Sequence, residues 1–250
     1  MQMLNKAPAV TLGFWLIKTM ATTVGETAAD YLNTTFHLGL AVTSYIMAAI
    51  LIFVLTAQLF TRRYIPIIYW IVVVLISVVG TLISDNLVDN IGVSLALSSA
   101  IFAAALAAVF IAWHRLENTL SVHTITTTRR EIFYWAAILA TFALGTSAGD
   151  LIAEKLGLGY PWSVVLFASL IALVAVAFYV FKINAVLAFW AAYILTRPLG
   201  ASAGDLLSQP AKAGGLGLGT TWTSLIFLVA IILLAAYMSF KQKQPAALPA

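Results

Sequence analysis

Four tryptophans in this chain are each followed by a glycine ten residues later and by an aspartate five residues after that glycine. The sets are Trp15–Gly25–Asp30, Trp70–Gly80–Asp85, Trp135–Gly145–Asp150 and Trp190–Gly200–Asp205. Successive tryptophans are 55, 65 and 55 residues apart. One match would mean little, but four at nearly constant spacing indicate an internal repeat, which constrains the fold more than any other feature.

The composition places these repeats in a membrane. The mean hydropathy is +1.02 and only 9% of residues are charged, whereas soluble domains carry about 25% charged residues. The lipid bilayer is therefore the expected partner. The net charge is +4, but the basic residues form no cluster in the sequence, so we expect no nucleic-acid binding. The absence of cysteine excludes disulfides, zinc–thiolate sites and a thiol nucleophile.

The chain contains eight apolar runs long enough to cross a bilayer, which takes about 20 residues. The expected spans are 8–31, 38–60, 65–88, 91–113, 131–154, 161–182, 184–208 and 219–240. The sequence thus predicts an all-α membrane protein with eight transmembrane helices, arranged as four parallel-oriented two-helix repeats. The first half would be 1–113 and the second 131–243, joined by a polar cytoplasmic linker at 114–130.

Basic residues set the expected orientation. All but two of the Lys and Arg residues outside the spans fall on the side that holds both chain ends, which the positive-inside rule places in the cytoplasm. The basic residues of that side are Lys6, Arg62, Arg63, Arg115, Arg129, Arg130, Lys182, Lys241 and Lys243, and those of the other side are Lys155 and Lys212.

Acidic residues gather at the opposite, outer ends of the odd-numbered spans. Seven of the nine acidic residues lie there: Glu26, Asp30, Asp85, Asp89, Asp150, Glu154 and Asp205. Because each repeat has two spans, all four repeats point the same way, as in transporters built from parallel repeats. Odd spans facing a shared interior, in a pseudo-fourfold or a two-by-two bundle, are the simplest arrangements.

Residues 3, 7, 11 and 15 positions after each tryptophan share one helix face, since each residue advances about 100°. In chain order these four stripes are Lys18, Thr22, Glu26, Asp30; Val73, Ser77, Thr81, Asp85; Ile138, Phe142, Thr146, Asp150; and Tyr193, Arg197, Ala201, Asp205. The tryptophan before each stripe and the aspartate at its end are constant, whereas the three residues between them vary. A shared scaffold with one asymmetric site is therefore expected.

The repeated glycine and aspartate suggest different roles. A glycine among small residues lets helix backbones approach closely. A carboxylate near a helix C-terminus is at the unfavourable end of the helix dipole and needs a cation, a proton or loop N–H groups nearby. The aspartates either converge on a polar cavity open to the outside or each tie down an outer loop.

Glu26 is the strongest single candidate. It lies one turn deeper than Asp30 on the same face, so the two carboxylates could share one metal ion or one proton; alternatively Glu26 pairs with a basic residue of another helix. Lys18 and Arg197 are intramembrane cations that could serve as counter-ions or attract an anion. Pro198 should kink its span and free a backbone carbonyl.

The chain resembles a family of uncharacterised bacterial membrane proteins built from tandem two-helix repeats of unknown function. The resemblance rests on the opening Lys6-Ala-Pro-Ala-Val-Thr-Leu-Gly-Phe-Trp15 and on Gly25-Glu-Thr-Ala-Ala-Asp30, and it extends over nearly the whole chain. It implies the repeat fold and a bacterial inner-membrane location, without an activity.

The leading functional hypothesis is a transporter of a hard cation, either a divalent metal such as manganese or a cation coupled to sodium or protons. Oxygen ligands without Cys or clustered His suit such ions. Glu26 and Asp30 would bind the ion, with the hydroxyls of Thr22, Thr81 and Thr146 on the same stripe. Asp85, Asp150 and Asp205 would line the outer vestibule. The alternatives are a proton-coupled anion or organic-acid transporter using Lys18 and Arg197, and a non-transporting scaffold or sensor. No catalytic arrangement or resident cofactor is expected.

Overall fold

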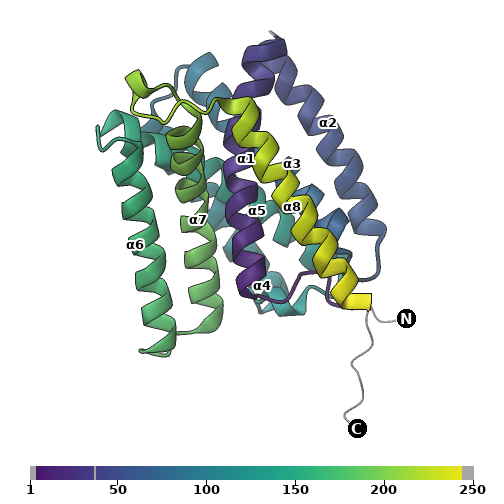
Figure 1. Ribbon diagram of the computed structural model, residues 1–250. Helices are drawn as coiled ribbons and strands as arrows, with labels where there is room; N and C mark the ends of the chain where they lie inside the picture. The colour runs from purple at the N-terminus through teal and green to yellow at the C-terminus, as the bar shows by residue number, and fades with distance from the viewer. Residues whose placement is uncertain (1–3, 37, 244–250) are drawn as a thin grey trace.

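The computed structural model describes residues 4–36 and 38–243, and these are all-helical (Figure 1). The long helices are α1 (Leu12–Phe36), α2 (Gly39–Phe60), α3 (Pro66–Asp85), α4 (Leu95–Glu117), α5 (Thr128–Asp150), α6 (Tyr160–Tyr179), α7 (Ala185–Ser208) and α8 (Thr220–Lys243). Seven of them, α2 to α8, are long and apolar enough to cross a membrane. The remaining helix, α1, is just as long, but Lys18, Glu26 and Asp30 make it more polar.

Local signals explain where several helices begin. Pro66 occupies the first turn of α3, where its missing N–H is not needed. The side chains of Ser94, Thr127 and Asn184 accept hydrogen bonds from free backbone N–H groups at the starts of α4, α5 and α7. These polar residues separate one apolar run from the next.

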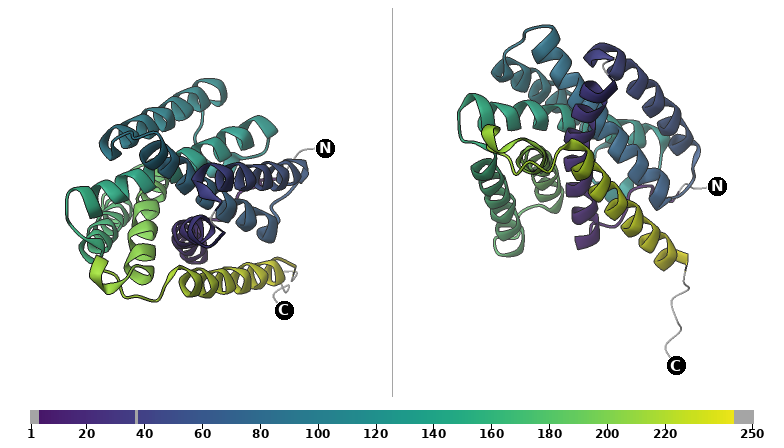
Figure 2. Two further views of the ribbon diagram at one scale, coloured as in Figure 1. Left: turned by 90° about the horizontal axis from the view of Figure 1, so that it is seen from above. Right: turned by 45° about the horizontal axis from the view of Figure 1, so that its top comes forward.

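The odd-numbered helices form a closed inner ring, in which α1 contacts α3, α3 contacts α5, α5 contacts α7 and α7 contacts α1. Within the apolar windows of α3, α5 and α7, 67%, 56% and 61% of residues are buried, against 11% for α2, α4 and α6. The odd-numbered helices therefore face a shared interior. Of the two arrangements expected from the repeats, they form the fourfold one. Figure 2 shows α1 from above with α8 beside it.

The four repeated glycines hold this ring together. A Cβ atom placed on any of them would lie only 2.5–2.6 Å from the Cβ atom of a residue in the next inner helix. The pairs are Gly25 with Ser77, Gly80 with Phe142, Gly145 with Arg197, and Gly200 with Thr22. In each pair the partner lies seven positions after the tryptophan of its own repeat. The predicted close-approach role of the glycines is confirmed, and the fourth pair closes the ring.

The even-numbered helices form an outer layer, and each of them packs on an unexpected neighbour. Each packs mainly on the odd helix of the following repeat: α2 on α3, α4 on α5, α6 on α7, and α8 back on α1. Figure 1 shows this last contact, with α8 lying across α1. The repeats therefore interlock, because each one supplies the outer cover of its successor.

Several helix ends differ from the expected spans. α1 ends at Phe36, so Asp30 lies inside the helix and not at its C-terminus. After Asp85 and Asp150 the backbone continues in short π-helical turns, at Asn86–Asn90 and Leu151–Lys155. For Asp30, Asp85 and Asp150 the helix end therefore lies beyond the carboxylate, contrary to expectation, whereas Asp205 lies in the last turn of α7, as expected. α7 runs through Pro198 as one continuous helix, and the expected kink at this residue stays a prediction.

A buried ion pair closes the end of the bundle that holds the start of α1 and the end of α8 (Figure 1). The Lys6 ammonium lies 2.5 Å from a Glu131 carboxylate oxygen and donates to the Leu59 carbonyl oxygen at 3.0 Å. Gln58 donates to the other oxygen of Glu131 at 3.0 Å. Lys6, Gln58 and Glu131 are all buried, so the segment before α1 is fixed to both α2 and α5.

Candidate functional site

The predicted stripes become layers of side chains across the inside of the ring. The end nearest the tryptophans is aromatic: the four residues that precede them are Phe14, Tyr69, Tyr134 and Phe189, and the Tyr69 and Tyr134 hydroxyls lie 2.5 Å apart. The opposite end carries the aspartates. The interior is thus closed by rings at one end and lined by carboxylates at the other.

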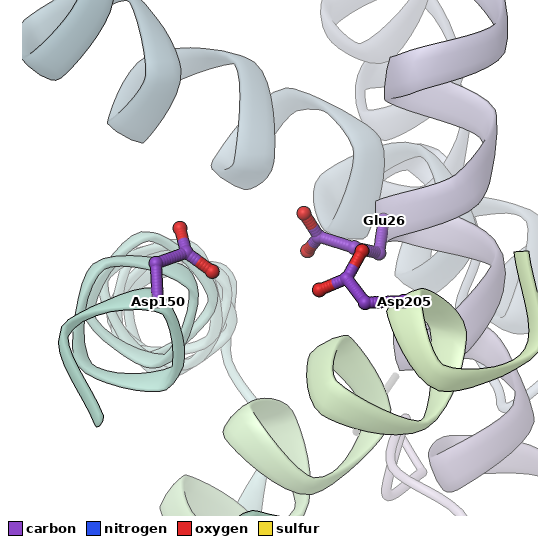
Figure 3. Close-up of side chains that lie close together, drawn as sticks. All are labelled: Glu26, Asp150 and Asp205. Carbon is purple, nitrogen blue, oxygen red and sulfur yellow. The ribbon is translucent and has the colours of Figure 1, made fainter. Parts of the chain in front are cut away.

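Three carboxylates from three repeats meet at the acidic end. Glu26 of α1, Asp150 of α5 and Asp205 of α7 each offer an oxygen atom within 4.8 Å of the other two. Figure 3 shows the three side chains pointing toward one another. Glu26 and Asp205 are each 6% exposed and Asp150 is partly buried. We call these three residues the acid cup.

The remaining two aspartates of the repeat lie near the acid cup. Asp30 and Asp85 are both repelled electrostatically by Glu26, and Asp85 also by Asp30. The structure groups Glu26 with carboxylates of other repeats, and joint binding of one metal ion by Glu26 and Asp30 stays a prediction. Asp30 is one turn along the same helix, and Asp150 and Asp205 project across the interior toward Glu26 (Figure 3).

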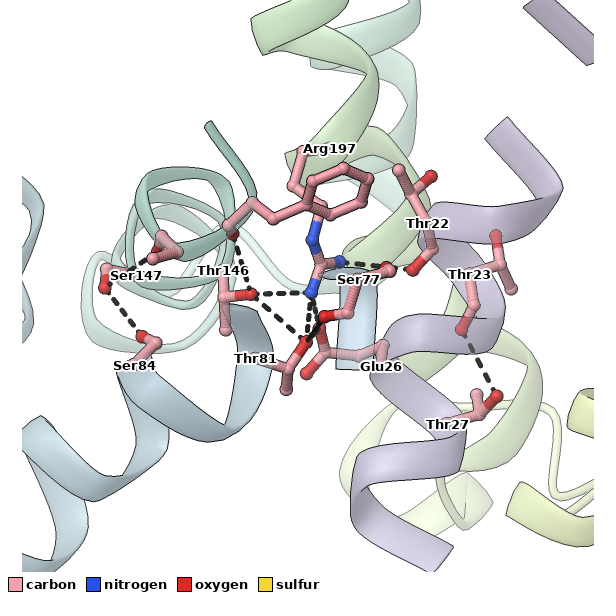
Figure 4. A network of polar contacts seen from close by, with 12 residues as sticks. Thr22, Thr23, Glu26, Thr27, Ser77, Thr81, Ser84, Thr146, Ser147 and Arg197 are labelled. Atoms are coloured by element: carbon pink, nitrogen blue, oxygen red, sulfur yellow. Dashed lines mark hydrogen bonds and ion pairs between the residues drawn. The ribbon is translucent and has the colours of Figure 1, made fainter. Parts of the chain in front are cut away.

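Arg197 of α7 lies directly against the acid cup. One terminal nitrogen, Nη2, donates to Glu26 at 2.9 Å, to Thr146 at 2.6 Å and to the hydroxyl of Thr81. The other, Nη1, donates to the Thr22 carbonyl oxygen at 3.2 Å. Figure 4 shows the guanidinium surrounded by α1, α3 and α5. The Arg197 side chain is fully buried, so one residue of the fourth repeat connects to the other three.

Lys18 lies one layer farther from the acid cup and is also fully buried. Its ammonium donates to the Tyr193 carbonyl oxygen at 2.7 Å and to the Thr196 hydroxyl, and it lies 4.3 Å from the centre of the Tyr193 ring. Within the described residues it makes no ion pair with a carboxylate. The expectation that Lys18 could be a counter-ion for the acids was therefore wrong, whereas for Arg197 it is confirmed through Glu26.

Sequence reasoning missed several polar contributors. Thr196 lies off the predicted stripe, yet it holds Lys18. The Ser147 hydroxyl lies 2.7 Å from that of Ser84 and 2.8 Å from that of Ser98, joining α3, α4 and α5. Ser77 was placed on the stripe, and its buried hydroxyl is without a hydrogen-bond partner among the described residues. Small polar residues in apolar spans were the available signal, since such groups seek partners across helices.

The chemistry of this site is that of oxygen ligands around a positive charge. Carboxylate and hydroxyl oxygens are the ligands that Mg²⁺, Ca²⁺ and Mn²⁺ prefer. Arg197 neutralises at most one of the five carboxylates that gather here. The remaining negative charge, in a largely buried place, favours the binding of cations or protons.

Comparison with protein families supports the repeat. One family model matches four times, at residues 13–64, 68–119, 133–184 and 188–244, and each match begins two residues before a repeated tryptophan. Comparison with curated proteins and with solved structures finds no match. Since the four matches together cover most of the chain, the protein belongs to the family described as a Repeat of Unknown Function (DUF347).

Proposed function

We propose that this protein is a membrane transporter of a hard cation, either a divalent metal such as manganese or a cation coupled to sodium or protons. In this proposal all eight long helices cross a bacterial inner membrane. The four repeats share one orientation, both chain ends are cytoplasmic, and the acid cup opens to the outside. The basic residues on the side of the chain ends support this orientation.

The acid cup is the observation that carries the proposal. Three carboxylates from different helices are within 4.8 Å of one another and little exposed. Unscreened like charges this close repel strongly in a low-dielectric interior. The described residues supply Arg197 as a partner for Glu26, but no hydrogen bond or ion pair for the Asp205 carboxylate. A bound cation would offset this repulsion and would use the oxygens as ligands.

Mn²⁺ uptake into proteoliposomes tests the proposal. Asp150→Asn and Asp205→Asn each keep the side-chain shape and remove one negative ligand, so uptake should fall at least tenfold, a change of about 1.4 kcal/mol in ion binding. Asp89→Asn is the matched control, because Asp89 is exposed and lies outside the acid cup. Equal uptake by all three variants and the unaltered protein would count against a cation site in the cup.

Proton-coupled transport of an anion or organic acid is the second candidate. It is favoured by Lys18, which is fully buried and bonded to neutral oxygens, beside the guanidinium of Arg197. Lys18→Met should then abolish uptake of a labelled carboxylic acid and leave Mn²⁺ binding unchanged. In a non-transporting scaffold or sensor, the carboxylate variants would lower stability while neither flux nor binding changed.

A further inference from the structure

The nitrogen Nη2 of Arg197 occupies a small cage of oxygen atoms. The cage consists of a Glu26 carboxylate oxygen and the hydroxyl oxygens of Thr81 and Thr146. These three side chains belong to equivalent positions, eleven residues after the tryptophans of repeats one, two and three. The fourth repeat has Ala201 there, whose small side chain leaves the position to the guanidinium arriving from Arg197.

The spacing of these oxygens matches the coordination of a metal ion. The Thr81 hydroxyl oxygen lies 3.5 Å from both the Thr146 hydroxyl and the Glu26 carboxylate oxygen. Oxygens that hold one Ca²⁺ ion at 2.3–2.6 Å are about 3.5 Å apart when they stand at right angles around it, and a smaller ion such as Mn²⁺ would draw them slightly closer. Glu26 also belongs to the acid cup, so the cage and the cup share one carboxylate.

The hydrogen bonds of the Arg197 guanidinium are unevenly distributed over its three nitrogens, which fits a group that can leave the cage. Its hydrogen bonds are concentrated on Nη2, while Nη1 has one bond, at 3.2 Å. The nitrogen Nε is buried and has no partner among the described residues. A buried donor left unpaired costs free energy, so the side chain gives up less on leaving than a fully bonded arginine would. The Phe142 ring, whose centre lies 5.6 Å from Cζ, offers an adjacent cation–π surface.

We infer that the Glu26–Thr81–Thr146 cage is a second cation site, which Arg197 fills in the resting protein as a tethered cation. The inference rests on the proposed function, because the ion would reach the cage from the acid cup through their shared Glu26. An ion that enters the cage must displace Arg197, so the arginine is the gate of the pathway. The ligand class is a hard metal cation bound by one carboxylate and two hydroxyls.

Counting bound ions tests this inference. The full chain is purified in nanodiscs, and Mn²⁺ alone is titrated by equilibrium dialysis. Arg197→Met keeps a long apolar side chain but empties the cage, so bound Mn²⁺ should rise from one to two per chain. Adding Thr81→Val and Thr146→Val removes two ligands with little change in shape and should return the count to one. If removing the positive charge of Arg197 only strengthened the attraction of Mn²⁺ to the acid cup, the affinity would rise but the number of bound ions would not change.

Two results would overturn the inference: an Arg197→Met protein that binds no more Mn²⁺ at saturation than the unaltered protein does, or an additional ion in Arg197→Met that persists without the two hydroxyls. Failure of the proposed function gives a different result. The unaltered protein would then bind no Mn²⁺, because the acid cup is not a cation site. Arg197→Met would still bind one ion in the cage, and the valine substitutions would remove it.

If Arg197→Met does not fold, Thr146→Val alone serves. It loosens the guanidinium and leaves the acid cup intact, so the affinity of the cup for Mn²⁺ should rise at least threefold. An unchanged or lower affinity would contradict the exchange.

Discussion

Replacing a repeated glycine by alanine should weaken the inner ring, and α1 contains a matched pair of positions for this test. A Cβ atom on Gly25 would lie 2.5 Å from the Ser77 Cβ and 2.9 Å from the Ser77 carbonyl carbon. On Gly13 it would lie 3.7 Å from its nearest neighbour, a Thr11 hydroxyl oxygen. Carbon atoms pack best at about 3.5–4.0 Å, so Gly25→Ala forces α1 and α3 apart by roughly 1 Å, while Gly13→Ala forces nothing.

The magnitude follows from comparing the two variants. Alanine is more favourable than glycine in a helix by up to about 1 kcal/mol, and this gain is available to both. Forcing an extra methyl group into a packed interior costs about 1–3 kcal/mol. The free energy of unfolding of Gly25→Ala should therefore be lower than that of Gly13→Ala by about 1–3 kcal/mol.

Thermal unfolding in detergent, followed by tryptophan fluorescence, measures this difference. For a chain of this size each kcal/mol corresponds to about 2–4 °C in Tm, so Gly25→Ala should unfold at least about 2 °C below Gly13→Ala. If Gly25→Ala is as stable as Gly13→Ala, or more so, the close approach of α1 to α3 is not what the repeated glycine serves.

Three further predictions concern other parts of the molecule. Lys6→Met leaves the buried Glu131 charge unpaired and should destabilise the protein by about 3–5 kcal/mol, whereas Lys6→Met with Glu131→Leu should recover most of that loss in the same unfolding assay. Trp190→Phe removes the 2.9 Å hydrogen bond from the indole to the Leu120 carbonyl oxygen and should cost about 1 kcal/mol; a Tm equal to that of the unaltered protein would contradict it. The chain contains no cysteine, so a membrane-impermeant maleimide should label Leu156→Cys in intact cells and Arg63→Cys only after lysis; the reverse pattern would invert the proposed orientation.

The repeat and its inner face could be predicted from sequence because they depend on periodicity alone. A fixed Trp–Gly–Asp spacing identifies equivalent helices, and the 100° advance per residue places Glu26 and Asp30 on one face. The structure confirms that this face points inward and that the glycines mark close contacts. Ion binding by the stripe residues stays a prediction, since no contact within the protein can test it.

The choice of neighbours could not be predicted in this way. Hydropathy gives each helix a buried face without saying which helix covers it, so the packing of α2 on α3 instead of α1 was not foreseen. The Lys6–Glu131 pair joins residues 125 positions apart, and neither lies on the repeated stripe. Lys18 shows the same limit, because its partners in α7 are a backbone carbonyl and a threonine that no charge pattern reveals.

The fourfold scaffold and the single arginine depend on each other. A ring with four identical interiors would bring four equal side chains to one axis, and a basic residue in all four repeats would place like charges together at high cost. One Arg197 avoids that repulsion and donates to oxygens of the other three repeats, while its own repeat has the small Ala201 at the equivalent position. The outer positions tolerate four aspartates only if cations or protons join them. Constant positions therefore build the ring and its acidic end, while the divergence of the positions between them creates one asymmetric centre, in which Arg197 pairs with Glu26 and for which we propose that a cation competes.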